Sequence, residues 1–291
     1  MLQYFTHSQI DFTKYNDIVS NSLSPIVYAE KWFLDLSAKS GWDLLVYNDY
    51  EALMPIPKAR LKSSFWKNSI VQPYFAQQLG LLSKNKIPDE IQLEFLQYLK
   101  SLKPFLYHFN HSQTAAYEDL NLHFRKNYIL DLQQNYDEIF AGFSKSKRQS
   151  VRKSKKNGIV VSEEFDIQQF IDFQHRNSNF KTSKKIIAQK SNILNYCLKN
   201  KLGKMFFTRH NETLIGIAFF IEYRNRIYYV HAASNEEGRK LLATDFILNH
   251  IIEIHAGTNK ILDFEGSEIP GVASFMESFG AINQPFPIIK S

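Results

Sequence analysis

The sequence predicts an α/β protein that contains two similar modules in tandem, and three observations support this prediction. The length of 291 residues corresponds to about two domains, and the content of 44% hydrophobic residues is enough for two packed cores. Both halves show the same order: a strand, two helices, three strands, a helix, a strand, a helix and a strand. No Gly/Ser linker separates the halves, so we expect the modules to pack together with a cleft between them.

The first half alternates short apolar runs with amphipathic stretches. Asn48-Asp49 separates two apolar runs and predicts a hairpin turn, while Pro73 marks an edge strand or a bulge. Pro88, followed by two acids, opens a helix whose apolar residues recur at helical spacing. The expected strands are Gln3–Thr6, Asp43–Tyr47, Ala52–Ile56, Ser69–Phe75, Phe105–Phe109 and Asn127–Leu132, and the expected helical stretches are Ser8–Asn21, Tyr28–Lys39, Pro88–Leu102 and Ala115–Leu120.

The second half begins with a basic helix and then follows the same order. Asn211-Glu212 and Arg224-Asn225 are the expected turns between consecutive strands, and Gly257 ends a long helix. The expected strands are Ile159–Ser162, Lys204–Arg209, Thr213–Tyr223, Arg226–Ala233, Lys260–Phe264 and Phe286–Ile289, and the later helices are Asp166–Asn177, Lys190–Asn200, Arg239–Ala256 and Pro270–Phe279. The join between the modules is expected after residue 132.

The positive charge of the chain is concentrated in one stretch. The formal net charge is +6, and residues 145–156 contain cations but no acid, so the rest of the chain is about neutral. Lys147 interrupts an apolar helical stripe that includes Phe143 and Val151. The cations are Lys145, Lys147, Arg148, Arg152, Lys153, Lys155 and Lys156.

A single helix is expected here, from a capping box at Asn135 and Glu138 to a stop at Asn157-Gly158. Its cationic stripe has two interpretations that stay open. The stripe is either a solvated helix face, which most charge runs are, or a docking strip for phosphates. A nucleotide, a coenzyme A moiety, a tRNA acceptor end or an anionic lipid head would each qualify.

Composition excludes several classes of site. Cys197 is the single cysteine, so no internal disulfide can form, and the sequence has no zinc-type Cys/His cluster. The N-terminus does not resemble a signal peptide, and the longest apolar run, Leu214–Ile221, is too short to cross a bilayer. We expect a soluble cytoplasmic protein without a transmembrane segment, a metal or a tightly bound cofactor. Peripheral membrane contact through the basic stretch stays open.

The order of the elements resembles the GNAT acyltransferase fold, in which each module is a mixed, mostly antiparallel sheet flanked by helices. Leu130–Leu132 and Phe143–Gly158 together resemble the linker-and-helix signature of the Fem-type transferases. Leu262–Ala281 is similar to the late strand, loop and helix of the same group. In the first half the resemblance rests on element order and on Gln72–Gly80. The group includes tandem-GNAT peptidoglycan aminoacyltransferases, which use aminoacyl-tRNA, and many uncharacterised relatives.

This resemblance implies a degenerate GNAT-like module over residues 1–132 and a second GNAT-like module over residues 133–291. It implies an acyl- or aminoacyl-transferase whose donor is acyl-coenzyme A or aminoacyl-tRNA. The acceptor would be an amine, either a small molecule or a compound like a peptidoglycan precursor. The alternative is a catalytically inactive GNAT pair that binds RNA or another anion through the basic helix, and turnover would separate the two hypotheses.

A coenzyme A-binding GNAT usually holds the pyrophosphate in a glycine-containing loop before a helix. That place reads Asn235-Glu-Glu-Gly238-Arg239-Lys240 here. The two acids repel phosphate, while Arg239 and Lys240 attract it, so ordinary coenzyme A binding is disfavoured. The candidate donor-binding residues are Lys147, Arg148, Arg152, Lys155, Asn235, Gly238, Arg239 and Lys240.

The candidate bases are His231, Asp263 and Glu265, which lie near the carboxyl ends of central strands. Transfer to an amine needs a proton acceptor and hydrogen-bond donors for the oxyanion. His231 is either such a base or a satisfied core histidine. Asp263 and Glu265 are expected to share one face of a strand and to tune each other's pKa, unless Asp263 only caps the next loop.

The candidate acceptor ligands are Gln72, Tyr74, Gln77, Gln78 and Ser267. Amides both donate and accept hydrogen bonds, which suits an acceptor rich in amides or hydroxyls. A Gln-rich turn is equally typical of ordinary surface, and Ser267 is equally placed to cap a helix.

Overall fold

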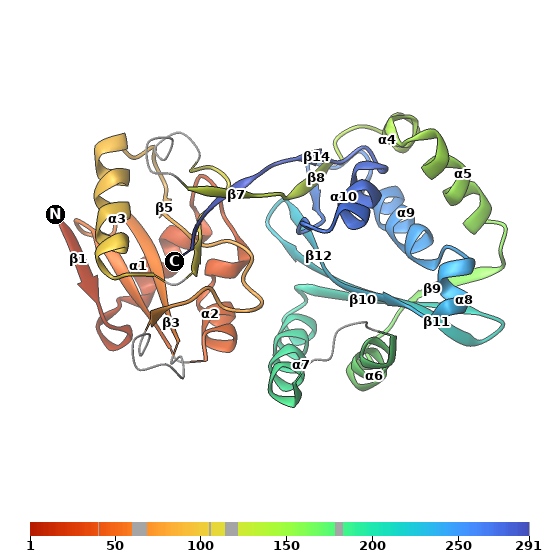
Figure 1. Ribbon diagram of the computed structural model, residues 1–291, viewed down its shortest axis with the longest axis horizontal. Coiled ribbons are helices and arrows are strands. Elements are labelled where there is room, and N and C mark those ends of the chain that lie inside the picture. Colours follow the sequence, from red (N-terminus) through yellow and green to blue (C-terminus); the bar gives the residue numbers. More distant parts are fainter. Residues whose placement is uncertain (40, 60–68, 105, 114–121, 178–182, 291) are drawn as a thin grey trace. The chain divides into compact units, whose positions relative to one another are not determined.

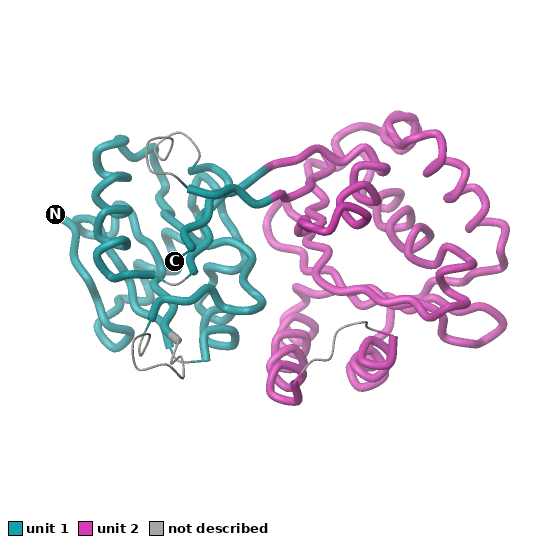
Figure 2. Tube along the Cα trace, in the orientation of Figure 1, with its two compact units in different colours: residues 1–125, 285–291 teal, residues 126–284 magenta. Residues whose placement is uncertain are grey.

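The chain forms two compact units, shown in Figure 2: residues 1–125 with 285–291, and residues 126–284. The computed structural model describes residues 1–39, 41–59, 69–104, 106–113, 122–177 and 183–290. The helical stretch expected at Ala115–Leu120 lies outside these residues. Each unit has its own sheet and core and is considered by itself below.

The first unit contains a five-stranded sheet and a three-stranded sheet. The larger sheet has the order β1-β2-β3-β4, and β5 also pairs with β3. In the smaller sheet, β15 lies between β6 and β7. The strands are β1 Leu2–Phe5, β2 Trp42–Tyr47, β3 Ala52–Ala59, β4 Ser69–Ile70, β5 Leu82–Ser83, β6 Leu106–His108, β7 His123–Arg125 and β15 Phe286–Lys290. The helices are α1 Phe12–Ser20, α2 Lys31–Ser37 and α3 Asp89–Ser101, with 3₁₀ turns η1 His7–Gln9 and η2 Val27–Ala29.

Large aromatic side chains fill the core of the first unit. Trp42, Tyr15 and Tyr28 are fully buried. At the start of α1, Asp11 caps the helix by accepting hydrogen bonds from two backbone N–H groups of the first turn. The expected β2–β3 hairpin is confirmed, and Asn48 and Tyr50 in its turn both have positive φ. Burial of the rings of Trp42, Tyr15 and Tyr28 removes a large apolar area from water and stabilises the unit.

The second unit contains a seven-stranded sheet with the order β14-β8-β13-β12-β11-β10-β9. Among the described strands of this sheet, β12 and β13 pair in parallel, and the other neighbours are antiparallel. The strands are β8 Tyr128–Asp131, β9 Ile159–Glu163, β10 Gly203–His210, β11 Thr213–Tyr223, β12 Arg226–Ser234, β13 Ile261–Asp263 and β14 Ile282–Asn283. The mixed sheet and its helices confirm the predicted α/β class.

Helices cover both faces of this sheet (Figure 1). On one face, α9 packs through Ile247, Leu248 and Ile251 onto the strands, together with α4, α5 and α10. On the other face, Phe170 of α6 contacts Phe207 and Phe219 of the sheet. The helices are α4 Tyr136–Gly142, α5 Lys145–Ser154, α6 Ile167–Asn177, α7 Lys184–Lys199, α8 Glu236–Lys240, α9 Ala243–His255 and α10 Pro270–Glu277.

The units divide differently from the expected modules 1–132 and 133–291. Strand β8 belongs to the second unit, because Leu130 pairs with Leu262 and Ile129 pairs with both Asp263 and Ile282. The last strand, β15, returns to the first unit and pairs with β6 and β7. Strand pairing between segments distant in sequence therefore sets the division.

The basic helix is two helices, which corrects the expectation of one. The chain is extended at Phe143, and Ser144 begins α5 by accepting a hydrogen bond from the N–H of Lys147. The expected capping box of Asn135 and Glu138 is confirmed. The helix expected over 239–256 is likewise split into α8 and α9, because Leu242 adopts a left-handed conformation with φ 64°.

Gly238 allows α8 to lie directly against β11. A Cβ atom at this position would lie 2.0 Å from the carbonyl oxygen of Ile215. We predict that Gly238→Ala lowers the free energy of unfolding by about 2–4 kcal/mol, because the backbone must move apart. Chemical denaturation checks this expectation.

Gly142→Ala is the matched control, because a Cβ atom there meets nothing within 4 Å. It should change the free energy of unfolding by at most about 1 kcal/mol. Equal effects of the two substitutions would contradict the close contact of α8 with β11.

Candidate functional site

Strands β12 and β13 separate in the middle of the second sheet. They pair in parallel from Arg226 with Ile261 to Tyr228 with Asp263. There β13 ends, whereas β12 continues to Ser234. Past Tyr228, no strand of the described residues pairs with one edge of β12, and the backbone N–H groups that point to this edge can serve a ligand.

A buried ion pair crosses the two strands just before they separate. Arg226 Nη1 lies 2.6 Å from Asp263 Oδ2, and Asp263 Oδ1 accepts a hydrogen bond from the N–H of Glu265 at 2.9 Å. Asp263 is 0% exposed, so both of its oxygens serve the fold. This corresponds to the loop-capping alternative for Asp263 rather than to a base that meets substrate.

Glu265 does not share a strand face with Asp263, which corrects that expectation. The strand ends at Asp263, and Glu265 follows in a left-handed conformation with φ 60°. Gly266 is also left-handed and packs against the backbone of Lys126 and Asn127. The period of two that relates side chains within a strand therefore stops before Glu265.

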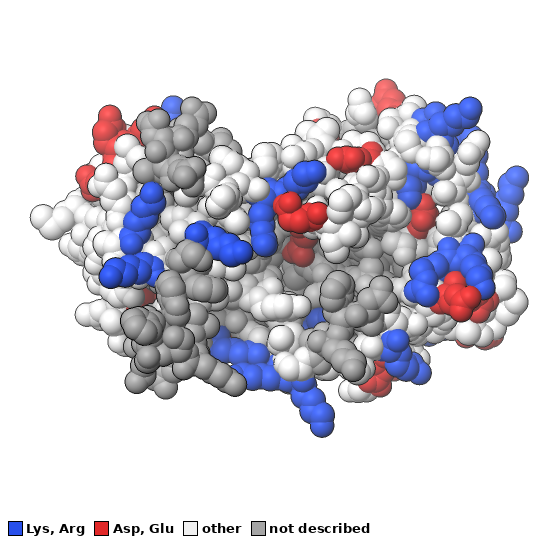
Figure 3. Space-filling model, in the orientation of Figure 1, with Lys and Arg blue, Asp and Glu red and all other residues white. Residues whose placement is uncertain are grey.

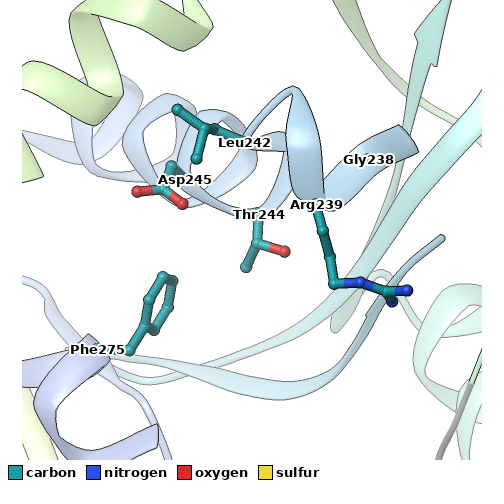
Figure 4. Close-up of a pocket in the computed structure, with 6 residues that line it drawn as sticks. All are labelled: Gly238, Arg239, Leu242, Thr244, Asp245 and Phe275. Carbon is teal, nitrogen blue, oxygen red and sulfur yellow. The ribbon is translucent and has the colours of Figure 1, made fainter. Parts of the chain in front are cut away.

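A pocket of about 290 Å³ lies where α8, the start of α9 and α10 come together (Figure 4). Thr244 of α9 and Phe275 of α10 face each other across it, and the Arg239 side chain extends along another side. The lining residues are Gly238, Arg239, Leu242, Thr244, Asp245 and Phe275. The pocket thus has an aromatic wall, a carboxylate and a guanidinium.

Lys147 and Asp245 form a second buried ion pair, beside this pocket. Their side chains are 7% and 10% exposed, and Lys147 Nζ lies 2.5 Å from Asp245 Oδ1. The ammonium also lies 3.9 Å from the centre of the Phe275 ring. Burial lowers the pKa of Lys147, although Asp245 opposes this shift. Among the described residues, no hydrogen bond reaches Asp245 Oδ2, so this oxygen is available to a ligand in the pocket.

Tyr229 adds a phenol near the carboxylate. It lies one residue beyond the last pair of β12 with β13 and stacks on Phe220. Burial, and then the charge of Asp245, raise the pKa of Tyr229. Tyr229 therefore stays protonated at neutral pH and can donate a hydrogen bond.

His231 lies on the opposite face of β12 from Tyr229. It pairs with Phe219, whose ring contacts Phe170 of α6. Burial lowers the pKa of His231 well below its usual value, and the charge of Lys190 on α7 lowers it further. His231 is therefore neutral at pH 7, and the same shift makes its ring a weaker base than an ordinary imidazole.

The residues expected to bind a donor pyrophosphate are occupied within the protein. Asn235 caps α8 by accepting a hydrogen bond from the N–H of Gly238 at 2.7 Å. Lys240 pairs with Glu236 at 2.7 Å. Arg239 donates to the carbonyl of Ser234 at 2.8 Å, but its guanidinium still lines the pocket. Within residues 235–240, Gly238 and Arg239 therefore line the pocket.

The cationic stripe of the basic stretch also has internal partners. Arg148 donates hydrogen bonds to the carbonyls of Ala141 and Phe143, which end α4. Arg152 lies over the Phe140 ring, and Lys155 pairs with Glu253 at 2.9 Å. The stripe therefore holds α4 and α9 in place, although Arg152 and Lys155 remain exposed.

The expected acceptor cluster divides into structural and exposed residues. Gln72 accepts a hydrogen bond from the N–H of His108, and Gln78 accepts one from the N–H of His111 while donating to Gln77 Oε1. Gln72 and Gln78 are buried. Tyr74 is 71% exposed and remains available to a ligand. In the second unit, Ser267 accepts a hydrogen bond from the N–H of Ile269, but α10 has its N-cap at Ile269, so Ser267 is not the helix cap that was the alternative.

The described part of the chain contains no candidate metal site and no candidate membrane-spanning helix. No group of three or more His, Cys, Asp and Glu residues there could hold a metal ion. None of the described helices combines the length and apolar character that a membrane span requires.

Comparison with known proteins identifies the fold. No protein-family model matches the sequence, and no curated protein matches it. A structure of FemX matches with a TM-score of 0.69 and 12% identity, over 98% of this chain and 96% of that one. A conserved protein of unknown function from Bacteroides thetaiotaomicron matches with a TM-score of 0.61 and 10% identity, over 100% of both chains. A tandem GNAT protein from the clavulanic acid biosynthesis pathway matches with a TM-score of 0.55 and 9% identity, over 99% of this chain and 97% of that one.

The fold of the chain is that of FemX and of the tandem GNAT protein. This fold was predicted from element order and from three short segments, and the comparison confirms it. At these identities the likeness establishes the arrangement of the chain and not its chemistry. Within this GNAT fold, the parted strands and the pocket define the candidate site.

The sequence contained one usable signal for the pocket of this GNAT fold. Lys147 interrupts the apolar stripe of α5, and Asp245 lies on the buried face of α9, beside apolar Leu248 and Ile252. A cation on one apolar face and an acid on another suggest a buried pair. Tyr229, Thr244 and Phe275 had no such signal, because rings and hydroxyls are common in cores.

We predict that Lys147→Met destabilises the protein by about 3–5 kcal/mol, because it leaves the Asp245 carboxylate buried without its partner. Adding Asp245→Leu should recover part of this loss, and chemical denaturation measures both. Lys240→Met, in an exposed pair, is the control and should cost less than about 1 kcal/mol. A double variant less stable than Lys147→Met would contradict the pairing.

Lys190 gives a pH-dependent prediction. Burial lowers the pKa of Lys190 to about 8, and its ammonium donates to Gln174 Oε1 at 2.6 Å. Between pH 8 and 10.5, the ordinary pKa of a lysine, the unfolded chain therefore binds more protons at this residue than the folded chain. The free energy of unfolding rises with pH in that window.

Lys190→Met should be more stable than the natural chain at pH 7, by about 1–2 kcal/mol. The difference should shrink as the pH rises through the window, because the natural lysine loses its charge. Denaturation at several pH values, with exposed Lys199→Met as control, measures this. A constant difference at all pH values would contradict it.

Proposed function

We propose that the protein transfers an aminoacyl group from an activated ester to an amine acceptor. The observation that carries this proposal is the pocket beside the parted strands, with Asp245 Oδ2 at one side and Arg239 at another. A donor with an ammonium group near its reactive carbonyl and a phosphate further away would complement both charges. An aminoacyl-nucleotide ester has this distribution of charge.

The helix α8 favours such a donor over acyl-coenzyme A. The N–H of Gly238 is already bound to Asn235, and Glu236 and Glu237 occupy the first turn. A pyrophosphate at this helix would meet two carboxylates and one fewer free donor. Arg239 supplies one guanidinium, which suits a single phosphate better than a pyrophosphate.

The reaction would take place at the open edge of β12. The amine nitrogen attacks the ester carbonyl, a carbon–nitrogen bond forms, and the bond to the donor's alcohol oxygen breaks. Backbone N–H groups beyond Tyr228 would hold the oxyanion. Neutral His231 would take the proton that the amine loses, and this proton then goes to the leaving oxygen. Asp263 would act only by holding the strands together.

Structures with this fold include one described as the C-terminal domain of a putative lysylphosphatidylglycerol synthetase from Agrobacterium fabrum. It matches with a TM-score of 0.55 and 10% identity, over 96% of this chain and 90% of that one. Its name denotes transfer of an aminoacyl group to a lipid. This supports the class of reaction proposed here, with a free amine as our proposed acceptor.

Transfer assays with aminoacyl-tRNA, N-acetyl-aminoacyl-tRNA and acyl-coenzyme A, each with a set of amines, test this proposal. Aminoacyl-tRNA should be the best donor, because its ammonium meets Asp245. Asp245→Asn should lower kcat/KM for it by about 10–100-fold and remove the preference over the acetylated donor. Exposed Asp172→Asn is the matched control. No transfer from any donor would contradict the proposal.

His231→Ala should lower kcat by about 10²–10⁴-fold, as expected for loss of a general base. His231→Gln keeps a polar side chain of similar size but cannot take the proton, so it should be equally slow. A more alkaline pH, at which the amine is already neutral, should partly restore both variants. Unchanged kcat in both variants would exclude His231 as the base.

A further inference from the structure

The break between α4 and α5 places aromatic rings beneath cations. The Arg152 guanidinium lies 5.5 Å from the centre of the Phe140 ring, and Lys155 Nζ lies 5.2 Å from that of Tyr136. The basic stretch itself contains no aromatic residue between 145 and 156. Folding therefore creates a row of paired cations and rings that the sequence alone does not show. In Figure 3, Lys and Arg side chains gather over this part of the second unit.

A groove continues from this row onto α9. It encloses about 320 Å³ and is lined by Lys155, Phe246, Asn249, His250 and Glu253. Phe246 and His250 are half-buried, so part of each ring is available for stacking. Burial lowers the pKa of His250, which keeps its ring neutral at pH 7. A planar, uncharged group fits between such rings.

Polar groups in the groove are held in fixed positions. Asn249 is 1% exposed and accepts a hydrogen bond from the Tyr136 hydroxyl at 2.8 Å. Its amide donates to Glu253 at 3.3 Å, and Glu253 also pairs with Lys155 at 2.9 Å. The carboxylate of Glu253 can accept hydrogen bonds from the amino group of a nucleobase.

Cations surround this groove on the side of α5. Burial opposes the charge of Lys155, but Glu253 and Tyr136 outweigh it and raise the pKa of Lys155. Lys153 and Lys156 next to it are exposed. None of the large apolar side chains that are exposed in the described part of the chain belongs to α4 or α5, and the one on α9, Ile254, does not line the groove. Insertion into a lipid surface would need such side chains.

We propose that the groove between α5 and α9 binds single-stranded nucleic acid, with one base against Phe246 and His250. The neighbouring phosphates would lie on Arg152, Lys155 and Lys156. Stacking on rings combined with a track of cations is the usual mode of binding single strands. This proposal uses none of the residues that line the candidate active site, so it does not depend on the proposed transfer reaction.

Fluorescence anisotropy with a labelled single-stranded RNA of about 12 nucleotides tests the proposal. The double variant Arg152→Glu with Lys155→Glu should bind at least about 30-fold more weakly, with a shallower dependence on salt. Phe246→Leu keeps an apolar side chain but removes the ring, and should weaken binding about 5-fold or more. Circular dichroism confirms that each variant folds.

Matched controls separate this site from a general charge effect. Lys199→Glu replaces one exposed cation on α7 by a carboxylate and should alter the affinity for RNA by less than about 2-fold. RNA binding is measured without any transfer substrate, so a failure of this proposal is distinguishable from a failure of the transfer reaction. Equal weakening by Lys199→Glu and by Lys155→Glu alone would overturn the proposal. So would binding to phosphatidylglycerol vesicles without binding to RNA.

Discussion

The ion pair between Arg226 and Asp263 holds β12 to β13 next to the point where the central sheet of the second unit opens. It joins the first residue of β12 to the last residue of β13, and Asp263 also accepts a hydrogen bond from the N–H of Glu265 as the chain turns away. An arginine and an aspartate this deeply buried are costly unless each satisfies the other. Their pairing therefore couples the end of β13 to the start of the gap in which ligand can meet the backbone of β12.

The second buried pair has a different consequence. Lys147 and Asp245 come from α5 and α9, so their contact holds the broken basic segment against the helix that lines the pocket. Because one oxygen of Asp245 is taken by Lys147, the carboxylate is fixed in direction while its other oxygen can face a ligand. A charge held in place in this way does not need to reorganise when a substrate binds. The same pair thus holds α5 to α9 and, in the proposed reaction, would orient the carboxylate that meets the donor.

The two faces of β12 offer different chemistry. Tyr229 and Asp245 lie toward α9, where the donor pocket is proposed, whereas His231 lies toward α6 and α7. The edge of β12 beyond Tyr228 lies between these two faces. A proton acceptor on one side and a donor pocket on the other would let two substrates meet without competing for one cavity.

The sequence by itself determined the fold class, most strands and helices of the second unit, and the local concentration of charge. These features depend on near neighbours: apolar spacing, helix caps such as Asn135, and turns such as Asn211-Glu212. It also indicated Lys147 as an anomaly in an apolar stripe. It could not show that Leu242 splits a helix, or that Phe143 and Ser144 break the basic segment, because packing overrides helical propensity at both places.

Only the tertiary structure decided which residues meet. It joined Lys147 to Asp245 and Arg226 to Asp263, buried Gln72 and Gln78, and gave β8 to the second unit and β15 to the first. Each of these contacts joins residues far apart in the chain, and no periodicity encodes such a partner. The physical reason is burial. A charge or an amide removed from water must find a partner, and the partner is whichever group folding brings within reach.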